Sequence, residues 1–374
     1  MPNDNRDDNV VLAIAQDYDS CCVPAMIALE AGDQLGVEDD AIPAIGEAPI
    51  GTILTGKELE DKINNDPKYK ALQEKISALK NSINAGHSIL MSASNRQFSG
   101  IEEANAKMNM NGRSVPVLRN LAAAVGLEFD NLWIYDLLLG LEPGTIMQSY
   151  EREAALAAIP NKTKEQVREY DEARSLKAKY ANAASQINER GLDKSKFSLI
   201  LLQCHYLALK YPDKEIRYVL IDDEADKHNI LMEALKKNKH LFPKNVVINF
   251  VLHQNYAEAA GRQAPEVENP ALYEPGNSLR GTRDVPLTHK QAAELFNKLA
   301  EEATIRTGLY SSFGLYDVAS YLLTHDVLRD EYLAEERAPV SVATTTGTLF
   351  NIEQKRDPGE GCARDTNEND NTPK

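Results

Sequence analysis

The chain has few cysteines and no long apolar run, and each shortage excludes a class of protein. Four cysteines occur in 374 residues, and no pair has the C-x-x-C spacing of a zinc or redox site. We therefore expect reduced thiols rather than a disulfide framework. No apolar run reaches the length that spans a bilayer, and the acidic, polar start (MPNDNRDDN) argues against a cleaved secretory signal.

Positive charge is also scarce. Lysine and arginine total 41 against 57 aspartates and glutamates, which gives a net charge of −16. A chain of this charge disfavours broad binding to nucleic acid or to an anionic membrane, but a phosphate site needs only one or two cations. Hydrophobic residues at 43% and charged residues at 26% are ordinary for a globular protein, and the length allows two or three domains.

Short apolar runs alternate with amphipathic segments along most of the chain. This alternation predicts an α/β fold, with a largely parallel sheet and helices on both faces. Apolar runs predict strands over residues 10–16, 87–93, 132–139, 215–221 and 245–252. Helical spacing predicts helices over residues 57–85 (divided at Pro67 and stopped by Gly86), 114–125, 196–210, 226–239, 288–303 and 316–333. Residues 148–190, interrupted at 160–161, are too polar for a central layer and predict a surface hairpin or cap.

Three of the expected strands end in polar residues. These are Asp17 and Asp19 after the first strand, Ser94 and Asn95 after the second, and Asp222 and Asp223 after a later one. The carboxyl ends of parallel strands meet at one edge of a sheet, where open α/β folds bind ligands. Carboxylates that converge there repel unless a cation lies between them, and Mg²⁺ takes carboxylate oxygens while leaving room for phosphate. The sequence therefore predicts a Mg²⁺ site at this edge.

This ordered set of motifs resembles the haloacid-dehalogenase (HAD) superfamily, most of whose members are Mg²⁺-dependent phosphohydrolases. The resemblance extends over about residues 10–252. It rests on D-x-D after the first strand, a serine after the second, a lysine that opens a helix, and an acidic pair after a later strand. It implies a HAD-like, Rossmann-type parallel sheet with helical cap insertions, and catalysis through an aspartyl-phosphate.

The resemblance assigns a role to each residue that matches a motif. Asp17 would be the nucleophile, which needs no activating base because a carboxylate is ionised at neutral pH. Asp19 would protonate the leaving oxygen and then activate water. Ser94, in preference to Ser92, would hydrogen-bond the phosphoryl group. The metal ligands would come from Asp17, Asp19, Asp222 and Asp223, with either of the last two as the direct ligand.

A lysine that opens a helix ahead of the acidic pair completes the set. Lys196 fits this position, and Lys194 is the alternative. Either would offset the negative charge of the nucleophile and the phosphate. Residues two apart point about 200° away from each other around a helix, so both cannot serve equally if both are helical.

The spacing between the motifs leaves room for insertions. The expected division is a catalytic core over residues 10–253 with insertions near 22–70 and 140–192, a loop and helical extension over 254–338, and a disordered tail over 339–374. The polar tail also resembles the tail signals of effectors that intracellular bacterial pathogens inject into host cells. That resemblance implies secretion into a host cell as an alternative to a cytoplasmic location.

Three functions are consistent with these motifs. A phosphatase would hydrolyse a phosphomonoester, either a phosphorylated small molecule or a phosphoprotein. A phosphotransferase would pass the phosphoryl group to an acceptor other than water. A non-catalytic module would keep the fold and bind a partner through its insertions, although the acids at both metal motifs favour an enzyme. Each residue also has an ordinary structural alternative, as a turn acid, a helix-terminal acid, a turn serine or a solvated lysine.

Overall fold

The computed structural model describes residues 7–17, 21, 56–94, 114–188, 192–223, 225–253, 278–307 and 315–325. All of them belong to one compact unit, residues 1–327. Several expectations lie outside the described residues: the place of Asp19 and Asn95, the greater part of the first insertion, and the tail from residue 339.

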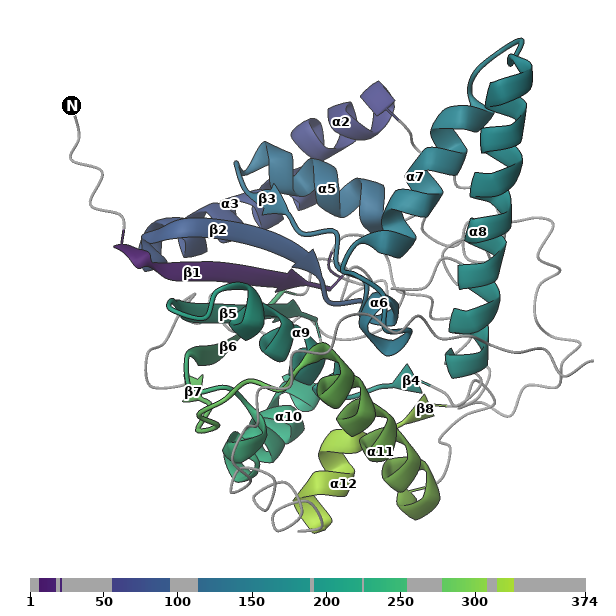
Figure 1. Ribbon diagram of the computed structural model, residues 1–374. Coiled ribbons are helices and arrows are strands. Elements are labelled where there is room, and N and C mark those ends of the chain that lie inside the picture. Colours follow the sequence, from purple (N-terminus) through teal and green to yellow (C-terminus); the bar gives the residue numbers. More distant parts are fainter. Residues whose placement is uncertain are drawn as a thin grey trace, which may run out of the picture. The chain divides into compact units, whose positions relative to one another are not determined.

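Among the described residues, six strands form the central sheet (Figure 1). In spatial order they are β3 (Glu128–Phe129), β2 (Ala85–Ser92), β1 (Asp7–Gln16), β5 (Glu215–Asp222), β6 (Val246–Leu252) and β7 (Leu279–Arg280). The first five run parallel, and β7 runs antiparallel to β6. The predicted α/β class with a largely parallel sheet is therefore confirmed.

β1 lies inside the sheet because its side chains are apolar on both faces. Residues 11–15 have no exposed surface, as is usual for a strand covered by helices on both sides. The register sets Gln16 opposite Ser92 of β2 and Ile221 of β5. The three strands therefore end at the same level, and the residues that follow them lie along one edge.

Helices cover both faces of the sheet (Figure 1). α3 (Pro67–Ile83) and α5 (Ser114–Ala124) pack on one face, in a core cluster with Leu12, Ile14 and Val219. Tyr218 is next to Val219 and points to the opposite face, because side chains alternate along a strand. There its hydroxyl donates to Gln203 of α9 (Phe197–Lys210) at 2.7 Å, so α9 covers the second face.

The remaining helices surround these layers. α2 (Gly56–Asn65) precedes α3, and Pro67 divides the two as predicted. α11 (His289–Thr307) packs on α9, and α12 (Val318–Thr324) packs on α10 (Ala225–Lys237) and on α11. A single 3₁₀ turn (Lys239–Leu241) leads from α10 to β6. Two short strands apart from the main sheet, β4 (Leu192–Asp193) and β8 (Leu315–Tyr316), pair in parallel.

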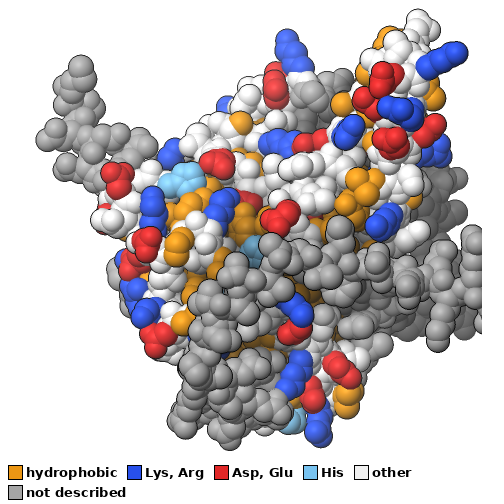
Figure 2. Space-filling model, viewed as in Figure 1, with side chains coloured by type: hydrophobic (Ala, Val, Ile, Leu, Met, Phe, Trp, Pro, Cys, Tyr) orange, Lys and Arg blue, Asp and Glu red, His pale blue; other side chains and the backbone are white. Residues whose placement is uncertain are grey.

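The predicted helical hairpin is present. α6 (Ile134–Leu138) leads into α7 (Thr145–Ala157), and α8 (Lys164–Asn188) returns alongside it after the break at residues 160–161. Acidic and basic side chains intermix over its outer surface (Figure 2). Ion pairs such as Lys177–Glu153 at 3.3 Å link the two helices. Of the described helices, none has the length and apolarity needed to cross a membrane.

Residues 132–139 do not form the predicted strand. Their centre is the helix α6, and the buried Asp136 carboxylate accepts hydrogen bonds from the backbone N–H groups of Trp133, Gly144 and Ile146. These bonds close the turn that joins α6 to α7. Residues 132–137 are all buried. The segment therefore lacks the alternation of buried and exposed residues that marks a half-buried strand, and it also lacks the exposed polar face that marks an amphipathic helix.

Three boundaries also differ from the prediction. Gly86 does not stop a helix: Asn84 caps α3 in the left-handed conformation (φ 50°), and Gly86 lies in β2, where a Cβ would come within 2.7 Å of the Asp8 backbone. β1 begins at Asp7, three residues before the start of the apolar run that predicted it. Tyr316 ends β8, and the helix expected from that residue begins at Val318.

The described cysteines, Cys21 and Cys204, are buried free thiols, as predicted.

Two buried histidines make the stability of the fold dependent on pH. Burial lowers the pKa of His205 from 6.5 to about 3, and burial and the nearby Lys75 lower the pKa of His253 to about 3. His205 accepts from the Leu287 N–H and donates to the Leu241 carbonyl, which only the neutral ring can do. The unfolded chain therefore binds more protons between pH 6.5 and 3, and stability falls as the pH falls through this range.

We expect the urea midpoint of unfolding to decrease between pH 7 and pH 5. His205→Gln removes one of the two groups and should make the decrease smaller, although the variant is less stable at pH 7. An equal decrease in the variant and the wild type would show that carboxylates, not His205, cause the effect.

Candidate active site

The site lies where β1 and β5 end side by side. Asp17 follows β1 directly, and its N–H donates to the carbonyl of Ile221 at 2.9 Å. Asp222 is the last residue of β5, and Asp223 follows it. From β1 the chain passes to β2 on one side of the sheet, and β5 and β6 are added on the other side. The gap between β1 and β5 is therefore a topological switch point, where open α/β sheets bind ligands.

Three buried carboxylates meet at this point. Asp17, Asp222 and Asp223 each offer an oxygen, and these oxygens lie within 4.8 Å of one another. The three residues are only 5%, 3% and 6% exposed. Like charges at this separation and burial disfavour ionisation unless a cation compensates them. Carboxylate oxygens are the ligands that Mg²⁺ prefers, so the residues present fit this metal.

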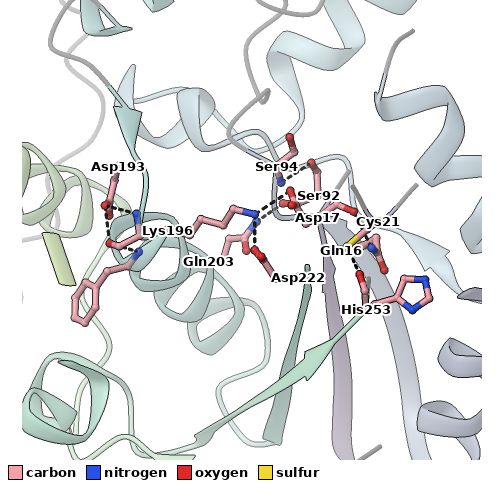
Figure 3. Close-up of polar contacts among 12 residues, drawn as sticks. Gln16, Asp17, Cys21, Ser92, Ser94, Asp193, Lys196, Gln203, Asp222 and His253 are labelled. Carbon is pink, nitrogen blue, oxygen red and sulfur yellow. Dashed lines mark hydrogen bonds and ion pairs between the residues drawn. The ribbon is translucent and has the colours of Figure 1, made fainter. Parts of the chain in front are cut away.

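Lys196 supplies one compensating charge. Its Nζ lies 2.9 Å from Asp17 Oδ1 and 2.5 Å from Asp222 Oδ2, and 8% of the side chain is exposed (Figure 3). Burial alone lowers the pKa of this ammonium group, but the two carboxylates outweigh it and raise the pKa well above its ordinary value. The lysine therefore remains charged, and it bridges the acids that follow two different strands.

The structure separates the two candidate lysines. Lys196 is the residue just before α9, and its side chain extends from that helix start to the carboxylates (Figure 3). Lys194 lies two residues earlier and forms an ion pair with Asp317 at 3.6 Å, where 34% of its side chain is exposed. Only Lys196 is placed to act on Asp17.

The end of β2 borders the site. Ser94 is 1% exposed, its N–H donates to Ser92 Oγ at 3.4 Å, and Figure 3 shows both serines beside Asp17. The Ser92 carbonyl accepts a hydrogen bond from Gln203 of α9 at 2.7 Å. The structure thus brings together Asp17, Ser94, Lys196, Asp222 and Asp223, while Asp19 lies outside the described residues.

Sequence reasoning missed Gln203. It lies in a helix of twelve consecutive buried residues, and it joins the end of β2 to the hydroxyl of Tyr218 in β5. These two bonds, to β2 and to β5, place Gln203 on the face of α9 toward the sheet. A glutamine inside the apolar run FSLILLQCHYLAL is the signal that marks it.

No protein-family model matches the chain, and no curated protein or solved structure matches it. The chemistry of the site therefore follows from the residues and contacts described above.

Proposed function

We propose that this protein is a Mg²⁺-dependent phosphatase that hydrolyses a phosphomonoester through an aspartyl-phosphate on Asp17. The observation that carries the proposal is the cluster of Asp17, Asp222 and Asp223 around the Lys196 ammonium at the switch point of the sheet. A parallel sheet with acids after its first strand and after a later strand also supports membership in the HAD-like superfamily.

In the proposed reaction, a carboxylate oxygen of Asp17 attacks phosphorus, and the bond from phosphorus to the ester oxygen breaks. Asp19 gives a proton to the leaving oxygen, a role that rests on the resemblance alone. Water then attacks the phosphorus of the aspartyl-phosphate and transfers a proton to Asp19. The bond between phosphorus and the Asp17 oxygen breaks, so that phosphate is released and the Asp17 carboxylate is restored. Bound Mg²⁺ would be held by Asp17 with Asp222 or Asp223 and would neutralise charge on the phosphoryl oxygens.

Lys196 and Ser94 have supporting roles in this proposal. The ammonium group is fixed before the substrate arrives, so it offsets the charge of the approaching phosphate without reorganisation. The Ser94 hydroxyl would donate to a phosphoryl oxygen. The intact ion pairs of Lys196 favour an enzyme over a non-catalytic module, because a binding surface does not require three buried acids and a buried lysine.

The first test is metal-dependent release of phosphate. We expect the EDTA-treated protein to be inactive on p-nitrophenyl phosphate and to recover activity with Mg²⁺. Mg²⁺ should also raise the melting temperature, since a metal that binds only the folded state stabilises it. Transfer of the phosphoryl group to an added alcohol in preference to water would indicate the phosphotransferase instead.

A matched control is a second buried aspartate paired with a lysine, Asp130 after β3 with Lys210 at the end of α9. Asp130 is 5% exposed, and its carboxylate accepts from Lys210 Nζ at 2.9 Å, from the Tyr206 hydroxyl and from the Leu132 N–H, none of which belongs to the carboxylate cluster. Asp130→Asn should leave the Mg²⁺ dependence unchanged, whereas Asp222→Asn should weaken it. The proposal fails if the wild type releases no phosphate with Mg²⁺, or if Asp17→Asn releases it equally fast.

A further inference from the structure

The loop that carries Lys196 is organised around a second buried carboxylate. In this lysine loop, residues 193–198, Asp193 is 5% exposed, and both of its carboxylate oxygens accept hydrogen bonds. Its Oδ1 accepts from the N–H and hydroxyl of Ser195 at 3.0 and 2.6 Å, and from the Val318 N–H at 3.2 Å. Its Oδ2 accepts from the N–H and hydroxyl of Ser198, both at 2.9 Å.

A distant part of the chain completes this loop. The hydroxyl of Ser195 accepts from the N–H of Ala319 at 3.1 Å, and the N–H of Lys194 donates to the Tyr316 carbonyl at 2.9 Å. β4 and β8 pair at the same place. The first residues of α12 therefore bind both Asp193 and Ser195, although 125 residues separate Val318 from Asp193.

The backbone of Lys196 needs this support. Lys196 has φ 60° and ψ 8°, in the left-handed region. Of the other described residues, only Asn84 and Asn161 share a positive φ without being glycine, and asparagine tolerates this conformation. For lysine this conformation is strained, and it persists only where the surroundings impose it. The Lys196 N–H donates to the Asp193 carbonyl at 3.1 Å, so Asp193 holds the lysine by its backbone and organises the loop by its side chain.

We propose that Asp193 is a positioning residue for Lys196, and that β8 and α12 hold the catalytic lysine in place through it. The expected effect on kcat rests on the proposed function. The placement of the Lys196 side chain can be measured by its chemical reactivity, without turnover. Figure 3 shows the two ends of this arrangement, with Asp193 at the start of the loop and the Lys196 side chain extended to Asp17 and Asp222.

The test compares Asp193→Asn with Asp136→Asn. Both carboxylates are buried and accept backbone hydrogen bonds at a helix start, but those of Asp136 come from Trp133, Gly144 and Ile146, at the starts of α6 and α7. Asp193→Asn replaces one carboxylate oxygen with an NH₂ group. In either orientation of the amide this NH₂ group faces N–H and O–H donors, so the hydrogen bonds at that position are lost. We expect kcat to fall about 10- to 100-fold with KM changed much less, because misplacing a preorganised charge affects mainly the transition state. Asp136→Asn should leave kcat nearly unchanged.

A second readout measures the lysine directly. The folded protein is treated briefly with an amine-acetylating ester, and modification of each lysine is quantified by peptide mass spectrometry. Lys196 in the wild type should react slowly, because it is buried and paired with two carboxylates. Its labelling should be at least about tenfold faster in Asp193→Asn and unchanged in Asp136→Asn. Equal labelling of Lys196 in these two variants would overturn the proposal and leave Asp193 as an ordinary helix cap.

Val318→Pro keeps the test decisive if Asp193→Asn does not fold. Val318 is the first residue of α12, where proline is tolerated, and the preceding Asp317 is extended (φ −134°, ψ 96°). The substitution removes the N–H that Val318 donates to Asp193. We expect a smaller change in the same direction in kcat and in Lys196 labelling. Unchanged labelling in Val318→Pro would show that α12 does not hold the lysine. A wild type without phosphatase activity would refute the proposed function, while the labelling would still test the positioning.

Discussion

Asp17→Asn is expected to abolish phosphate release while leaving the protein folded. The amide has nearly the same shape, and its oxygen can still accept the hydrogen bond from Lys196, which lies 2.9 Å from Asp17 Oδ1 in the wild type. It is a poor nucleophile and a weaker ligand for Mg²⁺, so it cannot form the acyl phosphate. Turnover of an aryl phosphate by the purified variant, at saturating Mg²⁺, is the measurement.

The control for this variant is Asp130→Asn, which alters an Asp–Lys pair away from the cluster. It should retain turnover, so a loss in Asp17→Asn alone points to chemistry rather than to stability. Residual activity within about tenfold of the wild type corresponds to only about 1.4 kcal/mol of barrier. Such a result would exclude Asp17 as the nucleophile.

Lys196→Met is expected to lower turnover by about a hundredfold or more, the scale of losing one preorganised charge contact. It should also reduce stability when Mg²⁺ is absent. The substitution removes the buried ammonium group that pairs with Asp17 and Asp222, and breaking a buried ion pair in this way costs about 3–5 kcal/mol. Because Mg²⁺ can replace the lost charge, the melting temperature of the variant should rise more steeply with Mg²⁺ than that of the wild type.

Lys194→Met is the matched control two residues away. Its partner Asp317 lies at 3.6 Å, and the lysine side chain is one-third exposed, so the pair contributes at most about 1 kcal/mol. Turnover and the response to Mg²⁺ should stay close to the wild type. Steady-state kinetics with the opposite ranking would transfer the role to Lys194, and no effect from either would remove the lysine from the mechanism.

Much of the fold is predictable from the sequence because apolar runs and helical spacing are local signals. β1 and β5 contain the apolar runs VVLAIA and YVLI, and acids come just after these runs, which indicates both the strands and the edge where the acids meet. Residues 132–139 carry no such signal. Their helix is fixed by Asp136 and by amide groups up to ten residues later, so the decisive contacts lie outside the apolar run itself.

Part of the candidate site is also predictable from the sequence, namely the acids that come at the ends of strands. Asp17, Asp222 and Asp223 follow strands, and parallel pairing brings strand ends together. The choice between Lys194 and Lys196 requires the left-handed turn at the start of α9, which no helical periodicity reveals. Asp193 was missed because its role depends on Val318, and a contact over 125 residues leaves no local pattern. In isolation, DKSKFS reads as a polar loop followed by a helix.

The contact between the lysine loop and α12 also has a consequence for synthesis of the protein. All the acids of the cluster leave the ribosome long before Val318 and Ala319, whose N–H groups complete the loop. At about 5–20 residues per second, the interval between Asp193 and Val318 is on the order of ten seconds. A nascent chain in that interval, or one cut short within it, has its carboxylates but lacks the outer hydrogen bonds that hold Lys196. The complete lysine loop therefore forms only late in translation.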